Sequence, residues 1–322
     1  VSRSSRTGLS RATSFALFII SCFQQAAVAA ESEFDASLTL GAAGLDNVFL
    51  SPPGEEVDDL AFIVSPELHF DYESPHLDAD LDYIYTWFLY TDLDTDSSYH
   101  NFGGSVTGKA LEEALQVEVG AERRQVLSNP LDVIPPSQLP LSGNLVDRDL
   151  YYVNPSYVHK FRNATIVDMN YVYEDFSYDD PTVQGNVNHD ARISVDNFAR
   201  GQGLTWALRY LWQETVYEIS LPWKYQQASA ELGFWATRRA RLFARAGKES
   251  PWDDPFDYSL KYSFWEAGFA YGVRDRLRAE FAIGEREFGS SWRGEFDYTF
   301  DWGNTVFSYS EKPTTRGFRG QN

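Results

Sequence analysis

Apolar and polar residues alternate along two neighbouring stretches of the chain, 62–73 and 77–90. The first stretch has an apolar residue at every second position, namely Phe62, Val64, Pro66, Leu68, Phe70 and Tyr72. After Ser74-Pro75-His76 the second stretch resumes the alternation in a new phase. A period of two predicts β-strands, because successive side chains of a strand point to opposite faces. Two such strands joined by a short turn predict a hairpin.

The length of these segments points to a membrane. Each runs for about 11 to 13 residues, more than the roughly 5 to 6 of an ordinary globular strand; a tilted strand needs roughly 9 to 11 to cross a bilayer. The alternation recurs up to residue 309 in about fourteen strands, with short turns alternating with long loops. The predicted fold is therefore all-β, an antiparallel transmembrane β-barrel. A β-sandwich or propeller is the alternative, but its strands should be shorter.

The layout of the first hairpin occurs a second time. Val153-Asn154-Pro155 stands where the first copy has Val64-Ser65-Pro66, and the alternation up to Tyr173 matches that up to Tyr85. This echo indicates that one hairpin template has been used twice. Because proline belongs at an edge, a bulge or a strand end, we expect both prolines near one membrane interface. Between the copies, the polar stretch 92–104 is expected to be a loop.

Composition narrows the class of protein. The 322-residue chain has 47 acidic and 27 basic residues and a net charge of −20, which argues against nucleic acid as a partner. Aromatic residues make up 16% of the chain, and the interfacial girdles of an outer-membrane barrel use such residues. The single cysteine, Cys22, provides no disulfide framework. Beyond residue 23 no apolar run approaches the roughly 18 residues of a spanning helix.

Residues 1–30 have the layout of a secretory signal peptide. Three arginines precede an apolar run at 14–23, and Ala27-Val28-Ala29 forms a small-residue cleavage site. We therefore expect a mature barrel domain of residues 31–322 in the cell outer membrane, in contact with outer-membrane lipids. A buried N-terminal helix and a lipoprotein acylated at Cys22 are the alternatives. The chain opens on Val1 rather than Met, so we expect a fragment at its start.

Two motifs near the end of the chain resemble a known family. They are Gly284-Glu285-Arg286-Glu287-Phe288-Gly289-Ser290-Ser291-Trp292 and Phe307-Ser308-Tyr309-Ser310-Glu311-Lys312-Pro313-Thr314-Thr315. With the proline-containing hairpin at 153–161, they resemble the outer-membrane β-barrel proteins associated with the PEP-CTERM/exosortase system of Gram-negative bacteria. The resemblance implies a role in export or surface display, with exopolysaccharide and export machinery as partners. Family chains are longer, so we expect the barrel to be incomplete after Asn322.

If the apolar faces of the strands meet lipid, the residues between them face the lumen. In the N-terminal hairpin these candidates are acidic apart from one histidine, and in the later strands they are arginines. The candidates are Glu67, His69, Asp71, Asp78, Asp80, Asp82, Arg239, Arg241, Arg245, Arg276 and Arg278. One hypothesis is a transverse field across the lumen that orients a charged, hydrated solute. The alternative is a set of solvated charges that pair locally and act on no solute.

Patterns for catalysis and metal binding are weak. The five histidines lack the spacing that sets a nucleophile beside a base, although His189-Asp190 and Asp179-Asp180 could build a hydrolytic site in outer loops. The run from Asp92 to Ser98 has the alternate spacing of a calcium loop but lacks its glycine and glutamate. We therefore expect no catalytic residue, no cofactor and no metal, and we predict a pore-forming, non-enzymatic barrel. The alternatives are a plugged scaffold or assembly factor and a surface hydrolase.

Overall fold

The computed structural model describes residues 30–93, 96–129, 144–162, 164–197, 203–250, 259–273, 276–287, 289–300 and 303–310. The expected signal peptide up to residue 29, with Cys22, and the chain after residue 310 lie outside this part. Within it, no helix is long and apolar enough to span a membrane.

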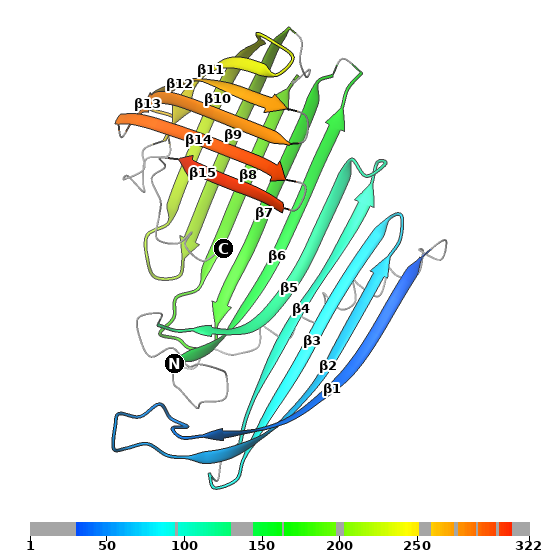
Figure 1. Ribbon diagram of the computed structural model, residues 1–322, viewed down its shortest axis with the longest axis vertical. Helices are drawn as coiled ribbons and strands as arrows, with labels where there is room; N and C mark the ends of the chain where they lie inside the picture. The colour runs from blue at the N-terminus through cyan, green and yellow to red at the C-terminus, as the bar shows by residue number, and fades with distance from the viewer. Residues whose placement is uncertain are drawn as a thin grey trace, which may run out of the picture. The chain divides into compact units, whose positions relative to one another are not determined.

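Fifteen strands form one sheet in which each strand lies beside its neighbours in sequence (Figure 1). The strands are β1 (Glu31–Leu45), β2 (Asp59–Glu73), β3 (Leu77–Tyr90), β4 (Asp96–Ala110), β5 (Leu115–Leu127), β6 (Leu145–Lys160), β7 (Ile166–Tyr178), β8 (Asn186–Asp196), β9 (Leu204–Tyr217), β10 (Trp223–Trp235), β11 (Ala240–Glu249), β12 (Tyr262–Val273), β13 (Leu277–Arg286), β14 (Gly289–Phe300) and β15 (Gly303–Ser310). The predicted fold class is confirmed: the chain is all-β, with the up-and-down antiparallel strand order of a transmembrane β-barrel.

The prediction of a loop at 92–104 is wrong, because β4 occupies Asp96–Ala110. The positions of β4 that share a face with the apolar residues of β3 include Ser98, Gly104 and Gly108, so apolar and polar residues barely alternate along it. Backbone pairing to β3 and β5 forms this strand where the side-chain pattern gives no signal. The predicted count of about fourteen strands therefore missed β4.

Pro66 lies in the middle of β2 and not at a strand end, and the expectation that both prolines lie near one membrane interface stays a prediction. The pairing between β2 and β3 runs on both sides of Ser65 and Pro66 but is interrupted at these two residues. There, the Ser65 hydroxyl donates a hydrogen bond to Thr86 Oγ1 at 2.8 Å. The missing proline N–H thus falls in a gap of the ladder, which is how a central position tolerates it.

The chain forms two compact units. Unit 1 comprises the residues up to Tyr152 together with Phe176–Val183, and unit 2 comprises Val153–Asp175 together with the residues from Gln184 onward. In unit 1, the loop between β1 and β2 packs on the sheet: Val48 is fully buried against Ala61 and Phe88.

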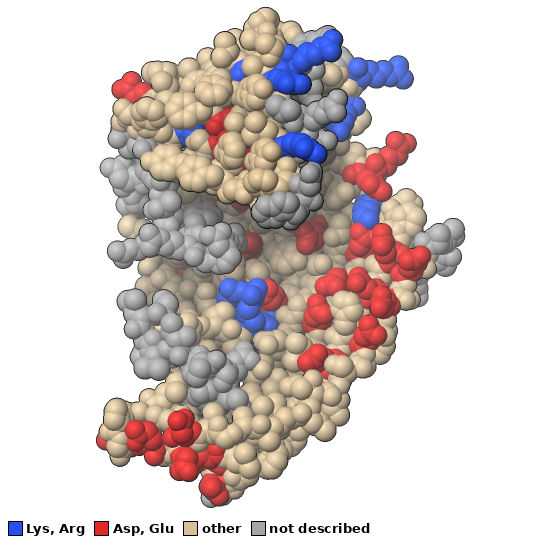
Figure 2. Space-filling view, viewed as in Figure 1, with Lys and Arg blue, Asp and Glu red and all other residues tan. Residues whose placement is uncertain are grey.

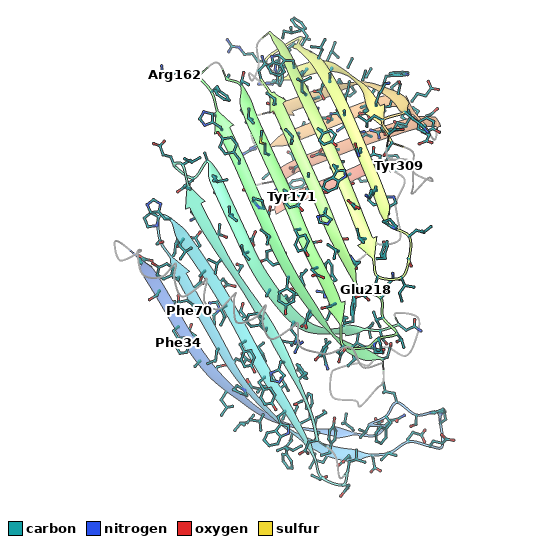
Figure 3. All side chains as sticks on the ribbon, turned by 180° about the vertical axis from the view of Figure 1, so that it is seen from behind. Phe34, Phe70, Arg162, Tyr171, Glu218 and Tyr309 are labelled. Atoms are coloured by element: carbon teal, nitrogen blue, oxygen red, sulfur yellow. The ribbon has the colours of Figure 1, made fainter. Side chains whose placement is uncertain are left out.

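Each strand has two unlike faces, as the alternation predicts. We call one the apolar face, which carries cross-strand pairs such as Phe34 with Phe70, and the other the polar face, which carries pairs such as Glu231 with Arg245. Figure 3 shows Phe34 and Phe70 on neighbouring strands of unit 1. Phe34 is 65% exposed and Glu231 is 2% exposed. This burial is the reverse of that in a soluble protein, where apolar side chains are inside.

The polar face of unit 2 is concave. Arg286 on β13 contacts Glu266 on β12 at 2.8 Å and Glu249 on β11 at 2.9 Å. With its amide oxygen turned toward Arg286, Gln227 on β10 accepts a hydrogen bond from Nη1 at 3.2 Å. In a flat sheet, strands three places apart are about 14 Å from one another. The sheet therefore curls toward its polar face between β10 and β13, as Figure 1 shows.

Small residues on the polar face permit this curl. A Cβ atom on Gly284 would overlap the carbonyl oxygen of Trp265, and one on Gly268 would lie 2.7 Å from the ring of Phe243. Phe243 is the cross-strand partner of Gly268, so its ring covers the space that the glycine leaves. Glycine kinks covered by aromatic rings are a means by which curved sheets bend and keep their register.

Candidate functional site

The polar face of β1, β2 and β3 in unit 1 carries a set of carboxylates that we call the acidic ladder. Its members are Glu31, Glu33, Asp35, Glu67, Asp71, Glu73, Asp78, Asp80 and Asp82. Several lie directly opposite one another, such as Asp71 with Asp80 and Glu33 with Asp71. Figure 2 shows acidic residues gathered over β1, β2 and β3. Like charges in such positions destabilise a sheet, so this set is not explained by the fold alone.

Basic residues are scarce on this face. Across the polar face of β1–β4, all of it described, the basic side chains are His69 and Lys109. His69 lies 2.8 Å from Asp82 through Nδ1 and 3.4 Å from Asp71 through Nε2, and Lys109 pairs with Asp78. All six candidates from the N-terminal hairpin thus share one face, and they keep an excess of negative charge.

One group of side chains on this face could hold a metal ion. His69, Asp80 and Asp82 each offer a ligand atom, and the three atoms lie within 4.8 Å of one another. This grouping has no signature in the sequence, because the three residues come from two strands and only the register of β2 with β3 brings them together. Exposed acidic groups often approach one another without an ion, so the expectation of no metal stays a prediction.

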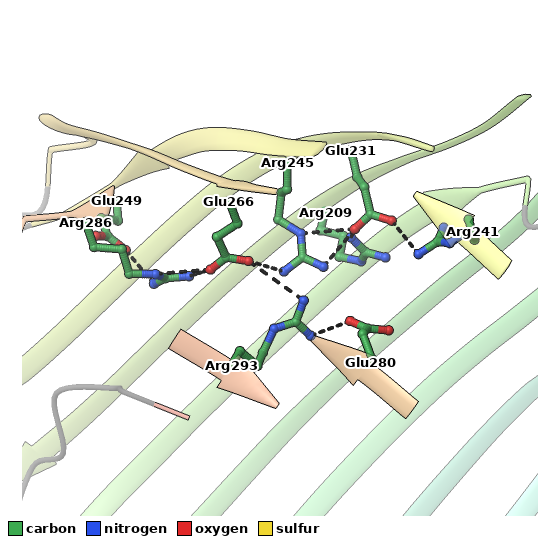
Figure 4. Close-up of polar contacts among 9 residues, drawn as sticks. All are labelled: Arg209, Glu231, Arg241, Arg245, Glu249, Glu266, Glu280, Arg286 and Arg293. Atoms are coloured by element: carbon green, nitrogen blue, oxygen red, sulfur yellow. Dashed lines mark hydrogen bonds and ion pairs between the residues drawn. The ribbon is translucent and has the colours of Figure 1, made fainter. Parts of the chain in front are cut away.

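The polar face of unit 2 carries charges of both signs, which we call the Arg–Glu network. It consists of Arg209, Glu231, Arg241, Arg245, Glu249, Glu266, Glu280, Arg286 and Arg293, from β9 to β14 (Figure 4). Glu231 is shared by Arg241 at 3.0 Å, Arg245 at 2.8 Å and Arg209 at 2.9 Å. Acidic and basic members nearly balance, unlike those of the acidic ladder.

The network continues through Glu266 and ends at Glu280. Glu266 accepts from Arg245 at 3.3 Å and from Arg286 at 2.8 Å, and Arg293 reaches Glu280 at 2.8 Å. Glu231 and Glu266 are buried, and Glu249 is 0% exposed. Ionised groups are buried only when paired, and this network provides such pairing.

The basic candidates divide into three groups. Arg241 and Arg245 lie on the polar face of β11 as predicted, but Glu231 and Glu266 neutralise them. Arg278 lies on the same face of β13, exposed and opposite Asp297. The placement of Arg239 and Arg276 in strands is wrong, because both lie exposed in turns that precede β11 and β13. The transverse field stays a prediction, with less positive charge available to it than the sequence suggests.

The sequence reading missed the glutamates of the network. Glu231, Glu249 and Glu266 each stand at a polar-face position between apolar-face residues, in step with the arginines of β11. The alternate spacing of these glutamates can therefore be read from the sequence. Their pairing depends on the register between strands, which the sequence does not state.

The residues considered for hydrolysis do not form a site. His189 and Asp190 are consecutive residues of β8, not of a loop, and so point to opposite faces. Asp190 pairs with Arg192 at 2.8 Å on its own strand. Asp180 lies in a turn, where it accepts hydrogen bonds from the backbone N–H and hydroxyl of Thr182, both at 2.8 Å; these bonds lower the pKa of the Asp180 carboxyl.

Comparisons with known proteins give little. No protein-family model and no curated protein matches the chain. It is similar to Salmonella typhi OmpF in complex with daunomycin, with 7% identity over 79% of this chain and 89% of that one and a TM-score of 0.33. It is also similar to Pseudomonas aeruginosa OpdQ, with 9% identity over 88% and 99% and a TM-score of 0.30. Likenesses this low do not establish a function, and none bears on the PEP-CTERM resemblance.

Proposed function

We propose that this chain is a pore-forming, non-enzymatic β-barrel of the outer membrane. The observation that carries the proposal is the inverted burial of its two faces. On the apolar face Leu208 is 54% exposed and Phe307 is 63% exposed, whereas Glu249 on the polar face is fully buried. Burying an apolar residue of this size is worth about 1.5–3 kcal/mol, so a face of them left in water would be unstable. A lipid environment removes that penalty.

We further propose that the pore favours cations. Among the described residues, the acidic ladder holds an excess of carboxylates that pair with no arginine, whereas the arginines of the Arg–Glu network are paired with glutamates. Fixed charge of one sign on the wall of a pore attracts the ions of opposite sign and repels the others.

A plugged barrel that acts as a scaffold is the second candidate. It is favoured by the dense packing of the concave face of unit 2, where Thr205, Glu249 and Ser250 are fully buried. Water does not reach these three residues. Under this alternative, the loops rather than the lumen residues would carry the function.

Single-channel recording in a planar bilayer separates the two candidates. We expect the chain to produce stable conductance steps, and in a salt gradient the sign of the reversal potential should show selectivity for cations. Correctly inserted protein that never conducts would reject the pore and favour the scaffold. Neither candidate function involves catalysis.

We also propose that the pore serves exopolysaccharide or PEP-CTERM protein export. The support for this step is the resemblance of the motifs at 284–292 and 307–315, together with the mid-chain hairpin. Adding the host's exopolysaccharide to the conducting bilayer provides the test: the polymer should block the current. Conductance that is unchanged by the polymer would leave the pore in place and remove the export role.

A further inference from the structure

Two tyrosine pairs on the apolar face each contact a histidine of the next strand. In unit 1, the hydroxyl of Tyr83 on β3 lies 2.7 Å from Nδ1 of His100 on β4, and the ring of Tyr85 lies 4.7 Å from the imidazole. In unit 2, Tyr171 on β7 makes the same contact with Nδ1 of His189 on β8 at 2.8 Å. Tyr173 lies 5.3 Å from that imidazole.

The two clusters are copies of one element. The first contains Pro66, Tyr83, Tyr85 and His100, and the second contains Pro155, Tyr171, Tyr173 and His189 in the same order and at nearly the same spacing. The first belongs to unit 1 and the second to unit 2. The repeated hairpin that the sequence shows therefore extends one strand further, to a histidine. A contact reproduced twice in a chain that has five histidines calls for a common reason.

Both clusters lie among exposed apolar side chains. Tyr83 is the cross-strand partner of Leu68, which is 40% exposed, and Tyr85 is the partner of His100. In unit 2, the imidazole of His189 also lies 5.8 Å from the ring of Trp212. Figure 3 shows the position of Tyr171 on β7. Aromatic girdles account for tyrosine and tryptophan at such positions, but not for a histidine, whose polar ring is costly beside lipid.

The first cluster borders a groove. Pro66, Leu68, Tyr83, Tyr85 and His100 line a hollow of about 330 Å³ on the apolar face. This is the low end of the volumes that small-molecule sites show. Apart from the tyrosine hydroxyls and the imidazole its walls are apolar, which suits a hydrocarbon chain.

The hydrogen bond to tyrosine determines what the histidine offers. When the tyrosine hydroxyl donates to Nδ1, the ring proton is on Nε2, which becomes a donor directed away from the tyrosine. A phosphate oxygen is a strong acceptor for such a donor. Near His189, the carboxylate of Glu214 is its cross-strand partner but is paired with Lys224 at 2.7 Å, which offsets its repulsion of an anion.

We propose that the two clusters are equivalent binding sites for membrane phospholipid, with a phosphate oxygen accepting from histidine Nε2 and an acyl chain lying along the apolar residues beside it. This inference rests on the proposed function, because it needs the apolar face to meet lipid. It assigns a ligand class to surface residues that the pore itself does not use.

Native mass spectrometry of the full chain in dodecyl maltoside, with added phosphatidylglycerol, tests the proposal by counting. We expect up to two retained lipids for the wild type, one for His100→Phe, one for His189→Phe and none for the double variant. His159→Phe is the matched control, since His159 also lies half-buried among aromatic rings, 4.6 Å from Phe161, but in β6 and outside both clusters. It should retain two.

Three outcomes would overturn the proposal. These are a wild type that retains no phosphatidylglycerol, a double variant that retains as much as the wild type, and equal retention of diacylglycerol, which has the acyl chains but no phosphate. Recording conductance from the same preparation distinguishes failure of the lipid sites from failure of the pore. Protein that conducts but retains no lipid would reject these sites and leave the proposed function standing.

Discussion

Glu231→Gln is expected to destabilise the folded chain by about 3–5 kcal/mol, the cost of removing one partner from a buried ion pair. The carboxylate is 2% exposed and is the shared acceptor of Arg209, Arg241 and Arg245. Glutamine keeps the shape but removes the charge, so three guanidinium groups lose their common counter-charge. The effect should exceed that of an exposed salt bridge, which is worth about 0–1 kcal/mol.

Urea titration of the protein refolded into lipid vesicles measures this change. Glu218→Gln is the matched control, because Glu218 is an exposed glutamate directly after the end of β9. We expect the control to unfold at the wild-type urea concentration and Glu231→Gln to unfold at a clearly lower one. Equal midpoints for the two variants would show that the Arg–Glu network does not hold the sheet together.

Neutralising part of the acidic ladder is expected to weaken cation selectivity. In Asp71→Asn/Asp80→Asn/Asp82→Asn, three neighbouring carboxylates are removed from the polar face of β2 and β3. A unit charge about 4 Å from a permeating ion is worth about 1 kcal/mol in water, so the cation-to-anion permeability ratio should fall on the order of fivefold or more. The reversal potential in a salt gradient measures the ratio.

A second variant separates position from net charge. Glu55→Gln/Glu56→Gln/Asp58→Asn removes the same charge from the loop between β1 and β2, where the three residues are exposed. Screening over about 8–10 Å at physiological ionic strength should make these charges weak in comparison. If both triple variants shift the reversal potential equally, the acidic ladder does not line the path of the ions.

Much of the fold follows from the period of two. The hairpin at 62–90 and the one at 265–283 alternate apolar and polar residues over most of their length, and both form strands where predicted. β4 could not be found this way, because serine, histidine and glycine occupy most of its apolar-face positions and leave little contrast with the polar face. For such a strand, the hydrogen bonds of its neighbours decide the conformation.

The candidate site was predicted less completely, and the reason is register. The six N-terminal candidates share one face because they belong to one hairpin, so their period sufficed. Whether Arg241 and Arg245 offer free positive charge depends on their partners on neighbouring strands, Glu231 and Glu266. The Tyr–His clusters depend in the same way on pairing between β3 and β4 and between β7 and β8. Side chains brought together by register cannot be read from the alternation of one strand.

The central claim is that the apolar face meets lipid and the polar face does not. Nitroxide labels at single cysteines test it on two adjacent residues of β10: Ser229 lies on the polar face and Ala230 on the apolar face. Ala270 on the polar face of β12 and Ala244 on the apolar face of β11 provide a second comparison. Cys22 is replaced in all four variants. We predict that oxygen, which partitions into the bilayer, relaxes the labels at 230 and 244 far more than those at 229 and 270. Equal relaxation at all four positions would contradict the membrane barrel.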